Sequence, residues 1–206
     1  MTRITALLAA GVVCLGVALG FFLTLRGGAE DRFAQCRDGA VAGGAAEIGG
    51  PFTLTAADGS RVTAADVITE PTLLYFGYTF CPDFCPTDLA RNAQAADLLA
   101  EAGTQVGQVF VSVDPARDTA EVVGDFAGFI HPDLVGLTGS EADVAEAAGA
   151  YRVYYSVPEG GDAFYLVDHS TFTYLVAPEV GFLDFFGSDE TPEAMAESVQ
   201  CFVERL

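Results

Sequence analysis

The 206-residue chain contains no lysine, only two histidines and only two methionines. Its nine basic residues are all arginine and are set against 29 acidic residues, so the formal charge is −20. Binding to nucleic acid requires positive side chains that displace counterions from phosphates, and this charge therefore excludes a general nucleic-acid role. The two methionines, Met1 and Met195, exclude a metal site built on several methionines. Partners should be neutral, cationic or metal-bearing, although an acidic excess also serves simply to keep a surface solvated.

Charged residues are absent from residues 4–25, an apolar run between Arg3 and Arg26. As a helix, this run would span roughly 33 Å, which is enough to cross the hydrocarbon core of a bilayer. We therefore predict a membrane anchor over residues 1–26. The alternative is a cleaved signal peptide, with a possible cleavage site at residues 18–20, but the apolar region of a signal peptide usually covers only about 7–15 residues.

The rest of the chain divides by composition into a tether and one domain. Residues 27–50 are rich in glycine and alanine and have few large apolar side chains, which is typical of a flexible linker. Residues 51–206 contain the regular alternation of apolar segments, and 51% hydrophobic residues overall are ample for one core. We predict a single folded domain over residues 51–206.

The five cysteines sort by their positions in the chain. Cys14 lies within the apolar run, whereas Cys81 and Cys85 form a close pair. Cys36 and Cys201 remain, at opposite ends of the part that follows the anchor. This pairing favours a Cys36–Cys201 disulfide, which persists only in an oxidising compartment, over two separate buried thiols. A disulfide would place the domain outside the cytoplasm.

Apolar periodicity and turn signals predict alternating strands and helices. An Asp58–Gly59 turn joins the first two strands in a small hairpin. We predict strands at residues 52–54, 61–63, 72–78, 109–113, 134–137, 164–167, 171–176 and 182–186, and helices at 87–102, 119–129, 140–151 and from 191 onward. Alternating strands and helices followed by a late strand–strand–helix unit indicate an α/β sandwich with a mixed sheet.

The stretch at residues 75–86, YFGYTFCPDFCP, is where we expect the chemistry. An apolar run typical of a buried strand leads into two cysteines four residues apart and then into a helix. Residues at this spacing share one helix face, with Cβ atoms about 5–6 Å apart. The positive end of the helix dipole also favours thiolate over thiol there. The stretch therefore predicts either metal binding or thiol–disulfide exchange.

Together with residues 111–115 (VSVDP) and 167–170 (VDHS), this stretch resembles the three signature segments of the Sco/SenC family of membrane-tethered copper proteins. The resemblance runs from about Ile48 to the C-terminus and implies a thioredoxin-like fold. It also implies that Cys81, Cys85 and His169 bind copper. The strands predicted on either side of His169 put this residue in a loop. Thiolates suit Cu(I), and imidazole suits both copper states. No second cysteine pair or nearby histidine completes a closed structural zinc site.

The resemblance further implies that Asp114 supports the metal site from beside the ligands. An ordinary Asp-Pro turn after a strand is the alternative reading of Asp114, and the residue alone does not decide between them.

The implied function is that of a copper chaperone rather than an enzyme. It would receive copper from a donor chaperone and deliver it to the dinuclear copper centre of cytochrome c oxidase, by contact with the copper-site subunit. The anchor would hold it in the inner membrane, with the domain on the periplasmic side.

A thiol–disulfide oxidoreductase that reduces the cysteines of the oxidase copper site is the alternative function. Two features count against it. The spacing is C-x-x-x-C where thioredoxins have C-x-x-C, and His169–Ser170 stand where thioredoxins place a cis-proline.

Overall fold

A computed structural model describes residues 32–37, 48–158 and 164–206. The chain divides into two units, residues 1–35 and 36–206, and the elements below all belong to the second. The predicted anchor at residues 1–26 and much of the tether lie outside the described residues. Within the described ranges, no helix is both long enough and apolar enough to cross a membrane.

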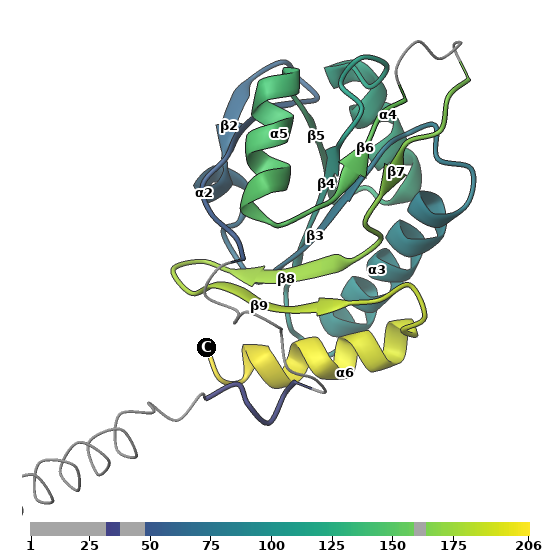
Figure 1. The fold of residues 1–206 in the computed structure, drawn as a ribbon. Coiled ribbons are helices and arrows are strands. Elements are labelled where there is room, and N and C mark those ends of the chain that lie inside the picture. Colours follow the sequence, from purple (N-terminus) through teal and green to yellow (C-terminus); the bar gives the residue numbers. More distant parts are fainter. Residues whose placement is uncertain (1–31, 38–47, 159–163) are drawn as a thin grey trace, which may run out of the picture. The chain divides into compact units, whose positions relative to one another are not determined.

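A seven-stranded sheet forms the centre of the second unit, in the order β2-β1-β5-β4-β3-β8-β9 (Figure 1). The neighbours β3, β4 and β5 are parallel, and all other pairings in this sheet are antiparallel. The strands are β1 (Thr53–Ala56), β2 (Arg61–Thr63), β3 (Thr72–Gly77), β4 (Gly107–Ser112), β5 (Leu134–Thr138), β8 (Thr173–Ala177) and β9 (Gly181–Phe186). The predicted mixed sheet and the N-terminal hairpin of β1 and β2 are confirmed.

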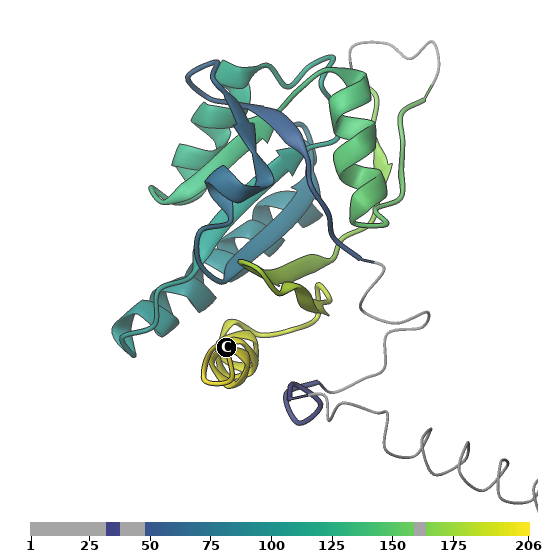
Figure 2. The same cartoon turned by 90° about the vertical axis from the view of Figure 1, so that its left-hand side faces the viewer.

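Helices cover both faces of this sheet (Figure 2). α3 and α4 lie on one face and α5 lies on the other, while α6 packs against α3. The helices are α2 (Ala64–Val67), α3 (Phe84–Glu101), α4 (Ala120–Ile130), α5 (Glu141–Ala150) and α6 (Pro192–Val203). Because both faces are covered, every residue of the central strand β3 is buried, which explains its unbroken apolar sequence.

Side-chain caps fix where three of the helices begin. Thr119, Ser140 and Thr191 each accept a hydrogen bond from the backbone amide three residues on. Such caps satisfy amides that have no partner inside the helix. At α5, Asp143 also accepts from the Ser140 backbone, so the two residues form a capping box.

The strand predicted at residues 164–167 is wrong, and so is the loop predicted for His169. A separate two-stranded sheet forms instead, in which β6 (Tyr155–Ser156) pairs antiparallel with β7 (Asp168–His169). Residues 164–167 carry no sheet hydrogen bonds, and their backbone is held by Arg117, which donates to the carbonyl of Tyr165 at 2.8 Å. In this apolar segment Leu166 is exposed and Val167 is buried, without strand pairing.

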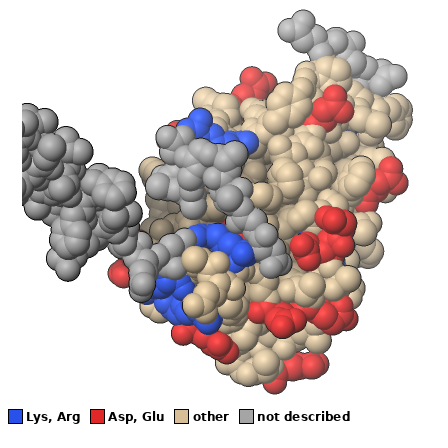
Figure 3. Space-filling model, turned by 60° about the horizontal axis from the view of Figure 1, so that its bottom comes forward, with Lys and Arg blue, Asp and Glu red and all other residues tan. Residues whose placement is uncertain are grey.

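Cys36 and Cys201 are joined by a disulfide, with their Cα atoms 5.6 Å apart. The bond links the first residues of the second unit to α6. Elsewhere on the surface, acidic side chains lie at many separate places on the face shown in Figure 3, as expected for a chain of charge −20.

Candidate metal centre

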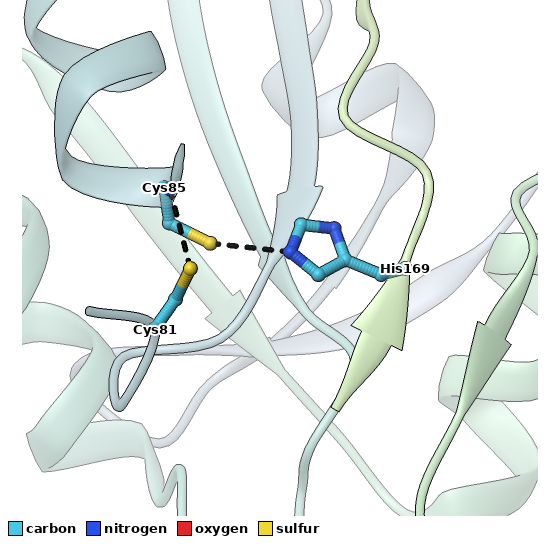
Figure 4. A group of neighbouring side chains, drawn as sticks. All are labelled: Cys81, Cys85 and His169. Atoms are coloured by element: carbon cyan, nitrogen blue, oxygen red, sulfur yellow. Dashed lines mark hydrogen bonds between the residues drawn. The ribbon is translucent and has the colours of Figure 1, made fainter. Parts of the chain in front are cut away.

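Cys81, Cys85 and His169 meet at the edge of the sheet where β3 ends. The loop from β3 carries Cys81, and Cys85 lies in the first turn of α3. His169 reaches the same place from β7 (Figure 4). The ligand atoms of the three side chains all lie within 4.8 Å of one another, and the Cys85 Sγ is 3.4 Å from the His169 Nε2. The three predicted ligands therefore share one location, where His169 from β7 meets two cysteines that are four residues apart in sequence.

The two sulfurs differ in accessibility and in protonation. Cys85 is fully buried, whereas Cys81 is partly exposed. A hydrogen bond from the Cys85 thiol, together with bonds from His169 and from the backbone amides of Cys85 and Asp83, lowers the pKa of Cys81 to about 3. The same bond to Cys81, and then burial, raises the pKa of Cys85. At neutral pH the pair is thus one thiolate and one thiol.

The imidazole of His169 is oriented by its neighbours. Its Nδ1 lies 2.8 Å from the carbonyl oxygen of Ser170, which can only accept a hydrogen bond. Nδ1 therefore carries a proton, and Nε2 is the ring nitrogen that faces the Cys85 sulfur. The rings of Tyr78 and Tyr75 stand edge-on to the imidazole, with centroids 5.6 and 6.3 Å away. This arrangement aims Nε2 at the place where the two sulfurs meet.

The comparisons with known proteins agree with this geometry. A family model described as SCO1/SenC matches residues 40–204. The chain belongs to the SCO1/SenC family. Protein SenC of Rhodobacter capsulatus is 49% identical over 205 residues, an alignment that covers 100% of this chain and 92% of the relative. The mitochondrial SCO1 homolog 1 of Arabidopsis thaliana is 45% identical over 164 residues, covering 79% of this chain and 49% of that protein, so the chain spans about half its length.

Solved structures similar to this SCO1/SenC chain include several that are described as having copper bound. The Arabidopsis thaliana ScoI structure has a TM-score of 0.70 at 42% identity and covers 76% of this chain and 99% of that one. Bradyrhizobium japonicum ScoI has a TM-score of 0.66 at 38% identity and covers 74% and 98%. The predicted family and its thioredoxin-like α/β fold are therefore confirmed.

Asp114 is buried, and its carboxylate bonds to Tyr165 and Arg117 rather than to the candidate ligands. Its carboxylate accepts a hydrogen bond from the Tyr165 hydroxyl at 2.7 Å and pairs with the Arg117 guanidinium. Arg117 in turn lies 3.5 Å from the centre of the Tyr165 ring and 5.0 Å from that of Phe80. Asp114 therefore connects the segment after β4 with the segment that leads to β7. A support role for it beside the ligands stays a prediction.

Asp118, which the sequence analysis did not single out, fixes the loop that carries Cys81. Its buried carboxylate accepts hydrogen bonds from the backbone amide of Thr79, at 2.9 Å, and from the hydroxyls of Thr79 and Ser112. The loop after β3 is thereby tied to the end of β4. The only sequence signal was an acidic residue just before a helix, which is usually read as part of a cap.

A buried polar network near the site joins β3, α3 and β8 in this SCO1/SenC chain. The Tyr75 hydroxyl donates to Asp88 at 3.0 Å, and Asp88 pairs with Arg91 at 3.3 Å. Arg91 donates to the carbonyl of Gly187 and to the hydroxyl of Thr173. The network fixes Tyr75, one of the two rings beside His169, to α3 and β8.

Replacing Gly77, the last residue of β3, by alanine should displace the Cys85 side chain of the site. An added Cβ would lie 2.7 Å from the Cys85 sulfur and 2.9 Å from a ring carbon of Tyr75, closer than real contacts allow. Overpacking of this kind typically costs about 1–3 kcal/mol. We expect Gly77→Ala to lower the midpoint of urea unfolding and to weaken copper binding in titrations of the full chain.

Gly128→Ala is the matched control, because nothing lies within 4 Å of a Cβ added at that position in α4. It should leave the unfolding midpoint unchanged or raise it slightly. Equal midpoints and equal copper affinities for Gly77→Ala and the unmodified chain would contradict the close contact between Gly77 and Cys85.

Proposed function

We propose that Cys81, Cys85 and His169 bind one copper ion, and that the protein delivers this ion to the copper-site subunit of cytochrome c oxidase during assembly. The observation that carries the proposal is the convergence of two sulfurs and one imidazole nitrogen within 4.8 Å. Sulfur ligands select soft Cu(I), and the imidazole also accommodates Cu(II). Because Cys81 is already a thiolate, it binds metal without first losing a proton.

Delivery would proceed by ligand exchange. Three protein ligands leave room in the coordination shell of copper for an incoming thiolate or imidazole of the acceptor. Since Cys81 is partly exposed and Cys85 is fully buried, the incoming ligand approaches on the Cys81 side and that bond is the first to be replaced. Cys85 and His169 hold the ion until the acceptor has enough ligands of its own.

The sequence and the disulfide support a proposed location. We propose that residues 1–26 anchor the protein in the inner membrane, that residues 27–50 act as a tether, and that residues 51–206 work on the periplasmic side. The apolar run at residues 4–25 supports the anchor. The Cys36–Cys201 bond supports an oxidising compartment. There a donor chaperone would supply the copper.

The thiol–disulfide oxidoreductase remains the second candidate, because one specific observation favours it. A thiolate at Cys81 beside a protonated Cys85 is the arrangement that exchange chemistry uses. The Cys81 thiolate would attack a partner disulfide, and Cys85 would then displace the reduced partner thiol. This forms a Cys81–Cys85 disulfide and transfers two electrons to the partner. The nearby imidazole has no required part in that reaction, whereas copper binding uses it directly.

Copper titration of the full chain separates the two functions. We expect one copper per chain, with sulfur and nitrogen ligands seen by X-ray absorption spectroscopy. If the reduced chain binds no copper at one equivalent, the chaperone proposal fails. If His169→Ala keeps the full copper affinity while the dithiol alone reduces insulin disulfides, the oxidoreductase function replaces it.

A further inference from the structure

Two phenylalanines beside the candidate ligands are exposed to water. Phe80 directly precedes Cys81 and is 54% exposed, and Phe84 directly precedes Cys85 and is 55% exposed. Leu166, next to Tyr165 and three residues before His169, is 60% exposed. Single exposed apolar residues are ordinary on a protein surface, but large ones gathered around one site indicate an interaction surface.

The exposed ring of Phe80 is in contact with the side chain of Arg117. The Arg117 guanidinium lies 5.0 Å from the centre of its ring and also lies over Tyr165, which precedes Leu166. Arg117 is fixed in turn by its ion pair with the buried Asp114. A side chain that is already oriented loses little freedom on docking, and aromatic residues contribute a large share of the energy at protein interfaces. The Arg117 contact therefore prepares Phe80 for contact with another molecule.

Charge indicates what kind of molecule fits there. Asp83, between the two cysteines, and Asp168, directly before His169, are both exposed. A second copy of this chain would bring the same carboxylates and a further charge of −20, so like charges would oppose each other. Anionic lipid headgroups would be repelled for the same reason. A protein surface that combines apolar and basic side chains is attracted instead.

We propose that Phe80, Phe84, Leu166 and Asp83 form the surface on which the copper-accepting protein docks, and that the acceptor presents apolar side chains flanked by lysine or arginine. The inference rests on the proposed function, because it assigns a partner to the same site. Docking there brings the acceptor's ligands to the accessible Cys81 sulfur. The apolar contacts hold the complex, and Asp83 steers its formation.

The test follows copper transfer from the full chain, loaded with one Cu(I), to the copper-free copper-binding domain of the cytochrome c oxidase subunit of the same organism. We expect Phe80→Ser and Phe84→Ser each to slow transfer about tenfold, a loss of about 1.4 kcal/mol, which is more than most interface side chains contribute. The copper affinity of each variant should stay within about twofold of the unmodified chain, because neither side chain contributes a ligand atom. Phe129→Ser is the matched control, since Phe129 is 86% exposed near the C-terminal end of α4. It should not change the rate.

Asp83→Asn tests the charge. It should slow transfer at low ionic strength and flatten the dependence of the rate on salt, because screening acts on the charge that has been removed. An unchanged salt dependence would overturn the basic character of the acceptor surface.

Three results would overturn the docking surface itself. Transfer at the original rate in both phenylalanine variants is one, and equal slowing by Phe129→Ser is another. The third is self-association of the chain, seen by sedimentation and lost in Phe80→Ser, which would make a second copy the occupant. An unmodified chain that binds no copper would instead refute the proposed function, so the two failures are distinguishable.

Discussion

Cys81→Ser, Cys85→Ser and His169→Ala should each weaken Cu(I) binding by more than about a hundredfold. Loss of an outer residue that only orients a ligand already costs 10–100-fold in metal affinity, so loss of a ligand should cost more. A serine hydroxyl is a hard, neutral donor and does not replace a thiolate on a soft ion. Alanine at position 169 removes the only imidazole within reach of both sulfurs among the described residues. Competition of the full chain with a Cu(I) chelator measures the affinity.

His131→Ala provides the matched control for the histidine. His131 is the only other histidine of the chain and lies at the C-terminal end of α4, where it contacts Asp97 and Gln108 rather than a cysteine. Its loss should leave copper affinity unchanged. A similar loss of affinity in His131→Ala and His169→Ala would show that the assay reports folding rather than coordination.

The location of Cys81 and Cys85 was predictable because both follow one strand within a few residues. A strand end, a turn and a helix start are local features, so the junction itself could be predicted. The expected shared helix face is wrong, because Cys81 lies in the loop before α3 and only Cys85 lies in the helix. His169 is different, because it is 84 residues from Cys85 and only the family resemblance brought it to the site. Its strand β7 has two residues, too few to show any periodicity. The pairing of β7 with β6 depends on tertiary structure, so no local sequence pattern predicts it.

The supporting polar residues were missed for a related reason. Asp118 holds Thr79 across 39 residues, and Arg91 contacts Thr173 across 82. In the sequence, both look like solvent-facing polar residues in or beside a helix. They become buried only once the loop after β3 packs on Asp118 and α3 packs against β8. A buried charged group requires partners, so such residues are identified from packing and not from spacing.

Removing the Cys36–Cys201 disulfide should destabilise the fold without affecting the metal site. The two cysteines are 165 residues apart, for which the chain-entropy model gives about 5 kcal/mol, and native disulfides typically contribute about 2–5 kcal/mol. We expect the double variant Cys36→Ser, Cys201→Ser to lose free energy of unfolding in this range, as measured by urea unfolding of the full chain. Copper affinity should persist, because neither sulfur is among the groups that meet at the metal site.

Thiol counting on the same preparations gives an independent check. In the folded chain, without reductant, an alkylating reagent should leave Cys36 and Cys201 unmodified and react with the accessible Cys81. Reductant should lower the stability of the unmodified chain but not that of the double variant. Alkylation of both Cys36 and Cys201 in the oxidised, folded protein would show that the bond is absent. It would also remove the chemical argument for an oxidising compartment, and leave the apolar run at residues 4–25 as the main support for the proposed location.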